Sequence, residues 1–170
     1  MKRANSRPVR AGSVTIGGGH PIVVQSMCAT RTQDIEATVN QAEMIHNAGA
    51  GLVRIAVDNP KDVDALAVVR QRVPQANLVV DLQENYRLVT QVAPHVNKVR
   101  YNPGHLYHHE KDKPVRDKVA LIAETAARHD LALRVGVNCG SVDPQKHIEF
   151  PGDDVGAMVA SALEHCAMLD

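Results

Sequence analysis

The sequence is poor in aromatic residues. Among its 170 residues it has no tryptophan, one phenylalanine (Phe150) and three tyrosines. Its core therefore has to be aliphatic, built from valine, leucine, isoleucine, alanine and methionine. Such a core suits buried parallel strands beneath amphipathic helices, and it disfavours a sandwich that is held together by a buried tryptophan.

The chain also lacks an excess of charge, because 19 lysine and arginine residues balance 19 aspartate and glutamate residues. Nucleic-acid binders usually have a basic excess, so this composition argues against nucleic acid as a partner. No apolar run approaches the ~18 residues of a membrane span, and we expect no membrane association. The only cysteines are Cys28, Cys139 and Cys166, without a Cys-x-x-Cys pair. Free thiols in a reducing cytoplasm fit this pattern best.

The apolar pattern predicts an N-terminal β-hairpin over residues 1–20, with a turn at Gly12-Ser13. Over residues 21–170 it predicts five strands, each followed by a helix. The predicted strands cover residues 22–26, 52–57, 78–82, 98–101 and 131–137. The predicted helices begin near Asp34, Pro60, Tyr86, Pro114 and Asp153.

Repeated strand–helix units imply a parallel sheet with right-handed crossovers. A dinucleotide-binding fold would need a Gly-x-Gly-x-x-Gly turn, which is absent after the first strand. A complete (βα) barrel takes ~250 residues. We therefore predict an α/β fold, a partial TIM-like barrel of about five βα units after the hairpin. The last helix is expected to turn an apolar face, which includes Val155, Val159 and Cys166, toward the core.

Four consecutive predicted strands carry a charged residue inside an apolar run. These residues are Arg54, Asp81, Arg100 and Arg134. A parallel strand buried on both faces should be almost wholly apolar, so the charged side chains need partners or access to water. In a barrel, the late part of each strand points toward the mouth where ligands bind. Two-residue periodicity adds Asn102 to the face of Arg100, and Asn138 to that of Arg134.

Arginines and asparagines that converge on one mouth suit a multiply charged anion, because the guanidinium fork matches phosphate oxygens. The alternative is a buried salt-bridge network between Asp81 and one or two of the arginines. The recurrence of arginine at equivalent strand positions favours a phosphate or diphosphate site, with Asp81 among its residues. Losing one arginine should weaken diphosphate binding.

The loop that follows Asn102-Pro103-Gly104 contains His105, His108, His109 and Glu110, a composition typical of metal ligands. A metal site needs three or four ligands in a defined geometry, and no second motif contributes any. We predict a solvated active-site loop and no metal site. Cys28 and Cys139 each follow a strand, but they do not supply the thiolates of an iron–sulfur cluster.

Several segments share the order and spacing of one enzyme family. They are Pro21–Met27, Thr30-x-Thr32-x-Asp34, Ala48–Arg54, Val80-Asp81-Leu82, Tyr86-Arg87, Val99–Gly104 and Arg134–Ser141. Together they resemble the N-terminal part of 4-hydroxy-3-methylbut-2-enyl diphosphate synthases. These are the iron–sulfur enzymes of the methylerythritol phosphate route to isoprenoids. The resemblance covers essentially the whole chain.

The resemblance implies a barrel whose mouth holds 2-C-methyl-D-erythritol 2,4-cyclodiphosphate, gripped by Arg54, Arg100, Arg134 and Asn138. The family reaction is a reductive ring opening with loss of water, and ferredoxin or flavodoxin supplies the electrons. A 4Fe-4S cluster on a separate C-terminal domain, usually of a neighbouring subunit in a homo-oligomer, performs it. The catalytic residues and cluster ligands are expected beyond Asp170. This chain alone should therefore bind substrate without converting it.

Three positions depart from the family pattern. The usual Asp-Ile-His-Phe is Asp81-Leu82-Gln83-Glu84 here, His105 replaces an asparagine, and Cys28 stands where threonine is common. Two other functions are alternatives for a barrel of this kind. A pterin-binding barrel of the dihydropteroate synthase type has a related architecture, but its characteristic motifs are absent. A non-catalytic diphosphate-binding module would use the same anion site.

Overall fold

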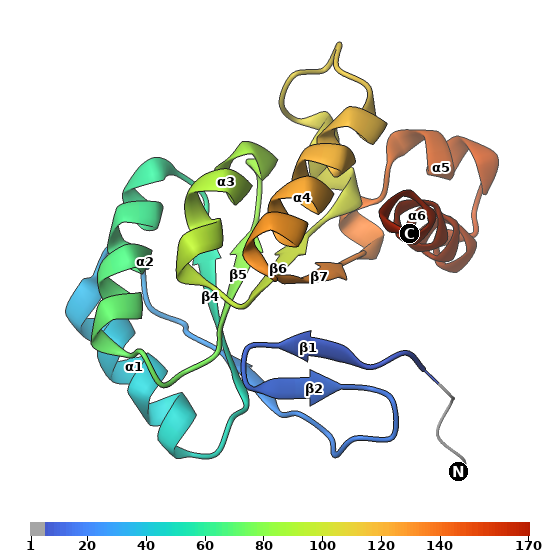
Figure 1. Ribbon diagram of the computed structural model, residues 1–170. Helices are drawn as coiled ribbons and strands as arrows, with labels where there is room; N and C mark the ends of the chain where they lie inside the picture. Colours follow the sequence, from blue (N-terminus) through green and yellow to red (C-terminus); the bar gives the residue numbers. More distant parts are fainter. Residues whose placement is uncertain (1–5) are drawn as a thin grey trace.

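The computed structural model describes residues 6–170 and contains two sheets (Figure 1). Strands β1 (Val9–Ala11) and β2 (Val14–Ile16) pair as an antiparallel hairpin. A parallel sheet has the order β3-β4-β5-β6-β7. Its strands are β3 (Gln25–Met27), β4 (Leu52–Val57), β5 (Leu78–Leu82), β6 (Lys98–Tyr101) and β7 (Ala132–Val135). Within the described chain β3 and β7 remain edges, so the predicted open part of a barrel after a hairpin is confirmed. Residues 1–5 of the predicted hairpin segment lie outside the described range.

Helices connect the strands and cover the outer face of the sheet. They are α1 (Ile35–Asn47), α2 (Pro60–Arg72), α3 (Val89–Val92), α4 (Val115–His129), α5 (Pro144–Glu149) and α6 (Asp154–Leu169). Neighbouring helices α1 to α4 touch one another in sequence order, as Figure 1 shows. None of the helices within residues 6–170 is long and apolar enough to cross a bilayer.

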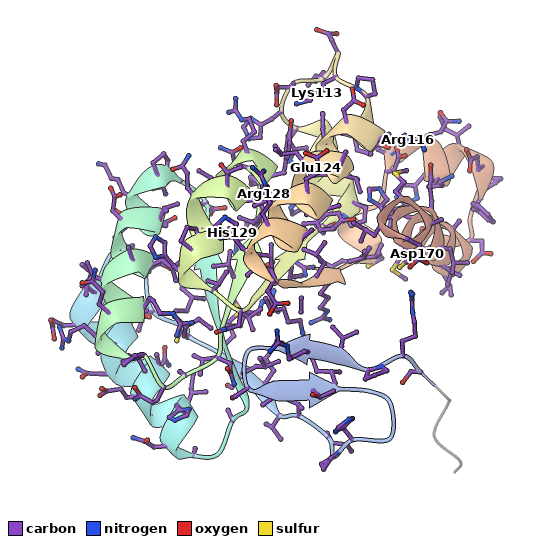
Figure 2. All side chains as sticks on the ribbon, in the orientation of Figure 1. Lys113, Arg116, Glu124, Arg128, His129 and Asp170 are labelled. Atoms are coloured by element: carbon purple, nitrogen blue, oxygen red, sulfur yellow. The ribbon has the colours of Figure 1, made fainter. Side chains whose placement is uncertain are left out.

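Local signals explain where the helices begin. Asp34 caps α1 by accepting a hydrogen bond from the Ala37 backbone N–H at 3.2 Å. Asn59 and Asp62 form a capping box around Pro60, which occupies the first turn of α2. On α4, the charged side chains of Arg116, Glu124, Arg128 and His129 are exposed (Figure 2). The apolar positions of that helix, such as Val119 and Ile122, are buried.

Alternation along the strands separates an outer core from an inner layer. Val53, Ile55 and Val57 of β4 point outward into the main aliphatic core beneath the helices. A smaller inner cluster joins Leu52, Val79 and Ala132 to Ala11 of the hairpin. The hairpin therefore covers the N-terminal ends of the strands, as Figure 1 shows, and leaves their C-terminal ends for a ligand.

The ends of the sheet differ from the sequence-based prediction. Strand β3 begins at Gln25 rather than Ile22, because Gln25 is aligned with Leu52, the first residue of β4. Before Gln25, the Val24 carbonyl still accepts a hydrogen bond from the Leu52 N–H at 3.2 Å, but the side chains of Ile22 and Val24 are exposed. Strand β7 ends at Val135 rather than residue 137. The helix predicted near Tyr86 consists of 3-10 turns on either side of α3, and α5 was not predicted.

The orientation predicted for the last helix was wrong. Val155 and Val159 are 65% and 52% exposed, and Cys166 is exposed as well. The buried stripe of α6 is instead Ala157, Ser161 and His165. Small residues allow α6 to lie close to its neighbours, where it contacts α4, α5 and β7. His165 Nδ1 also lies 3.3 Å from the Tyr101 hydroxyl, a partner that hydropathy alone does not reveal.

Candidate functional site

The strand register brings the predicted charged residues onto one face of the sheet. Arg100 on β6 is aligned with Asp81 on β5 and with Arg134 on β7. On β4, Ala56 is aligned with Asp81, so Arg54 lies two residues earlier on the same face. The outward-facing residues between them belong to the main core. All four charged side chains therefore face the inside of the open barrel.

These side chains line a cavity of about 360 Å³ at the C-terminal ends of the strands. Its lining residues are Arg54, Asp81, Gln83, Glu84, Arg100, His105, Arg134 and Asn138. The structure thus brings together five of the six predicted binding residues, namely the strand residues and Asn138. Three arginines against two carboxylates give the lining a positive balance, which suits an anion.

Asp81 is the common partner of two arginines in the cavity. Its side chain is 4% exposed, and it accepts a hydrogen bond from Arg54 Nη2 and another from Arg100 Nη1, the latter at 2.8 Å. The salt-bridge network considered from the sequence is therefore present, and it lies inside the predicted anion cavity. A buried carboxylate held between two cations fixes the direction of both guanidinium groups.

Arg100 needs a glycine beside it, directly after the end of β7. A Cβ atom at Gly136 would lie 2.1 Å from Arg100 Nε, which no side chain allows. Arg100 Nη2 also donates to the Gly136 carbonyl at 3.3 Å. The absence of a side chain at Gly136 thus leaves room for the Arg100 guanidinium group.

Part of the positive charge on this face remains without a counter-charge. Within residues 6–170, Arg134 makes no ion pair and Arg54 Nε is buried without a hydrogen-bond partner. Burial lowers the pKa of nearby Lys98, and the charges of Arg134 and Arg54 lower it further. Arg134 is exposed, so the lining combines a buried unpaired donor with a solvent-accessible arginine, which suits the binding of an anion.

Asn102 does not line the cavity, although the sequence predicted it among the binding residues. It is fully buried, its amide nitrogen donates to Ser141 Oγ at 2.6 Å, and its oxygen accepts from the Gly104 N–H at 3.1 Å. A Cβ at Gly104 would lie 1.8 Å from the Ser141 carbonyl oxygen. Asn102 therefore joins two loops of the mouth through both ends of its amide.

Three lining residues were not predicted as site residues: Gln83, Glu84 and His105. Gln83 could have been found, because it lies two residues after Asp81 and so continues the inward face of β5. Strand periodicity could not find His105, because this residue lies in a 3-10 turn (Pro103–Tyr107), although the loop that contains it was predicted to belong to the active site.

The histidine-containing loop (residues 105–110) is held in place by Lys118 and Tyr86. Lys118 of α4 is 1% exposed, and its Nζ donates to the carbonyl oxygens of Leu106 and His109, each at 2.7 Å. Burial lowers the pKa of Lys118. On the other side of the loop, the Tyr86 hydroxyl hydrogen-bonds to Glu110. The loop is therefore held at both ends, which positions His105 at the cavity.

The residues described do not fit a metal ion or an iron–sulfur cluster. Within residues 6–170, no group of three histidine, cysteine or acidic side chains is arranged to hold a metal ion. Cys28 is buried, whereas Cys139 and Cys166 are exposed. The chemistry supported by these residues is anion binding.

The family described as the GcpE TIM-barrel domain matches residues 6–170. The chain belongs to this family. The GcpE domain is 57% identical over 171 residues to the 4-hydroxy-3-methylbut-2-en-1-yl diphosphate synthase (flavodoxin) of Rhodopirellula baltica, covering 100% of this chain and 44% of that protein. Proteins of the same name from Nitratiruptor and Lysinibacillus sphaericus are 37% and 36% identical. The matches cover 100% and 99% of this chain, and 46% and 43% of those proteins.

The GcpE domain thus spans less than half the length of these curated relatives. The family match confirms the resemblance inferred from the segments around Arg54, Asp81, Arg100 and Arg134. It also favours the synthase family over the pterin-binding barrel considered from the sequence.

Proposed function

We propose that the GcpE domain is the substrate-binding part of a 4-hydroxy-3-methylbut-2-enyl diphosphate synthase. Its ligand is 2-C-methyl-D-erythritol 2,4-cyclodiphosphate, which the complete enzyme opens reductively with loss of water. The observation that carries the proposal is the cavity with three inward arginines, of which Arg134 has no counter-charge within the described chain. The synthase names of relatives matched over the whole chain support it.

Each cavity residue has a distinct part in binding. Arg54, Arg100 and Arg134 donate hydrogen bonds to the diphosphate oxygens, and Asn138 adds an amide donor at the end of β7. Asp81 binds no phosphate, because two anions would repel each other. It holds Arg54 and Arg100 in the direction that the ligand requires. Because the donors are already oriented before the ligand binds, the entropic cost of binding is lower.

The electrons have to come from outside this domain. The names of the relatives support flavodoxin as the donor, with ferredoxin as the alternative. A 4Fe-4S cluster in the remaining part of such a protein supplies the electron transfer, with ligands other than Cys28, Cys139 and Cys166. The catalytic residues belong to that part as well. We further propose that the complete protein is cytoplasmic, since a reducing compartment keeps thiols free. As the family resemblance implies, we also propose that it is a homo-oligomer.

Titration calorimetry of the 170-residue chain with the cyclic diphosphate tests this function. We expect binding by the wild type, and an affinity about 10- to 150-fold lower for Arg134→Ala, which loses charge-assisted hydrogen bonds. Arg128→Ala, on the exposed outer face of α4 (Figure 2), is the matched control and should bind like the wild type. No binding by the wild type, or equal binding by Arg134→Ala, would contradict the proposal.

A turnover assay separates the synthase from a non-catalytic binding module. The isolated chain should bind the cyclic diphosphate without converting it. A full-length protein that contains this domain should convert it when reduced flavodoxin is present. A full-length protein that binds the compound but never reduces it would favour the binding module.

A further inference from the structure

His105 contributes an imidazole to the anion cavity, and the tautomer of this ring follows from its partner. The side chain is 21% exposed and lies among the lining residues. Its Nδ1 contacts the backbone carbonyl oxygen of Gln83. A carbonyl oxygen only accepts hydrogen bonds, so Nδ1 carries the proton and donates it. In the neutral ring, Nε2 is then an acceptor.

Nε2 of His105 is accessible and unoccupied by protein. Within residues 6–170 it has no hydrogen-bond partner, and it is not among the buried unpaired side-chain atoms, which are Arg54 Nε and Ser161 Oγ. The ring plane is held by stacking on His108, with centroids 5.2 Å apart and planes at 22°. His108 is fixed in turn by its contact with the Glu84 carboxylate.

His105 Nε2 differs from the other polar groups of the cavity in the hydrogen bonds that it can make. Arginine side chains only donate hydrogen bonds, so Arg54, Arg100 and Arg134 can bind phosphate or hydroxyl oxygens but cannot accept the proton of a hydroxyl group. The two carboxylates always accept: Asp81 binds two arginines, and Glu84 contacts His108 through Oε2 while its Oε1 lies 3.8 Å from His105 Nδ1. The amides of Gln83 and Asn138 can turn either end toward a ligand. Among the neutral side chains of the lining, His105 Nε2 is therefore the acceptor whose polarity the fold dictates.

We propose that His105 Nε2 accepts a hydrogen bond from a hydroxyl group of the bound molecule and so selects a hydroxyl-bearing diphosphate over bare pyrophosphate. This inference rests on the proposed function, because it assumes that the arginines hold a diphosphate. The cyclic diphosphate proposed above retains the hydroxyl groups that are not esterified. Arginines then provide affinity for the diphosphate group, and His105 recognises the polyol.

Calorimetry with two probes, inorganic pyrophosphate and the cyclic diphosphate, tests the inference on the 170-residue chain. His105→Phe keeps a ring to stack on His108 but removes the acceptor. It should lower the affinity for the cyclic diphosphate about 2- to 12-fold, the value of one neutral hydrogen bond. Its affinity for pyrophosphate should stay within about twofold of the wild type. His105→Gln restores an acceptor and should recover most of the loss. Arg134→Ala is the contrasting variant and should weaken both ligands.

Nitrogen NMR of the wild-type imidazole tests the inference directly. If His105 had only a structural role, the chemical shift of its Nε2 would not change when ligand binds. The Nδ1-protonated form should be present before ligand is added, and the Nε2 resonance should shift with the cyclic diphosphate more than with pyrophosphate. This measurement also decides the matter if His105→Phe fails to fold.

Two outcomes overturn the assignment while the proposed function stands. The first is unchanged binding of the cyclic diphosphate by His105→Phe. The second is an equal loss for both probes, which would make His105 a cation for phosphate rather than an acceptor for hydroxyl. If the wild type binds neither probe, the proposed function fails first and this inference fails with it.

Discussion

Arg100 and Asp81 are aligned residues on neighbouring parallel strands, and Arg100 Nη1 lies 2.8 Å from Asp81 Oδ1. Arg54 donates to the other oxygen of the same carboxylate. One buried anion thus orients two cations at the mouth of the open barrel. We therefore expect stability and the proposed ligand binding to depend on the same side chain, because the contact that neutralises the arginines also directs them.

Replacing Asp81 with asparagine should be strongly destabilising. The substitution leaves two partly buried guanidinium groups without their counter-charge, and we expect the free energy of unfolding to fall by about 3–5 kcal/mol. Urea unfolding measures the change. Asp130→Asn is the matched control, because Asp130 pairs with Arg10 at a site where the aspartate side chain is 77% exposed. The control should lose under about 1 kcal/mol. Equal losses in the two variants would refute the role given to Asp81.

Asn102→Ala should reduce stability because both ends of the amide are used inside the protein. Leaving Ser141 and Gly104 without this partner should cost about 1–3 kcal/mol in urea unfolding. Asn47→Ala, at the exposed end of α1, should change stability far less. A variant at position 102 with normal stability but weaker binding of the cyclic diphosphate would instead support the ligand role predicted from the sequence.

His165 should make the protein less stable as the pH falls. Burial lowers the pKa of this ring, despite the nearby carboxylates of Glu164 and Asp143, so the folded state resists protonation. The unfolded chain then binds more protons below the ordinary histidine pKa, and the free energy of unfolding falls between about pH 7.5 and pH 5.5. His165→Gln should reduce this slope. Burial also lowers the pKa of His95, so some slope should remain.

Urea unfolding at several pH values provides the measurement for His165. His129→Gln, on the exposed end of α4 (Figure 2), is the control and should keep the wild-type slope. A variant without His165 that loses stability on acidification as steeply as the wild type would show that other groups govern the pH dependence.

The cysteines should differ sharply in reactivity. Burial raises the pKa of the Cys28 thiol to about 11, so almost none of it is the nucleophilic thiolate near neutral pH. Cys139 and Cys166 are exposed. An aromatic disulfide reagent at about pH 8 should label these two in the native protein, and Cys28 only in urea. Peptide mass spectrometry identifies the labelled sites. Rapid native labelling of Cys28 would contradict its burial.

The central strands were predictable because their signal is local. Residues 52–57, 78–82 and 98–101 form strands with the predicted bounds, since each is a short apolar run between turn-forming residues. The same runs revealed Arg54, Asp81 and Arg100 as charges inside apolar segments. Edges were less predictable. Where β3 begins depends on where β4 begins, and that information is not contained in residues 22–26.

The candidate site shows the same division. Period-two alternation was sufficient to place Arg134 and Asn138 at the mouth, and the cavity contains both. It failed for Asn102, which lies at the point where the strand turns into a 3-10 segment and bonds within the loops. It also could not find His105, because a turn rather than a strand carries that ring to the cavity.

The sequence by itself determined the alternation of strands and helices, the aliphatic core, and the family to which the segments around the arginines belong. Only the tertiary structure decided which charges meet. Asp81 is shared by Arg54 and Arg100, Arg134 is left free, and His105 is turned toward the ligand cavity. The physical reason is that burial patterns are local along the chain. Ion pairs and tautomers depend instead on register and on loops that fold back from distant positions.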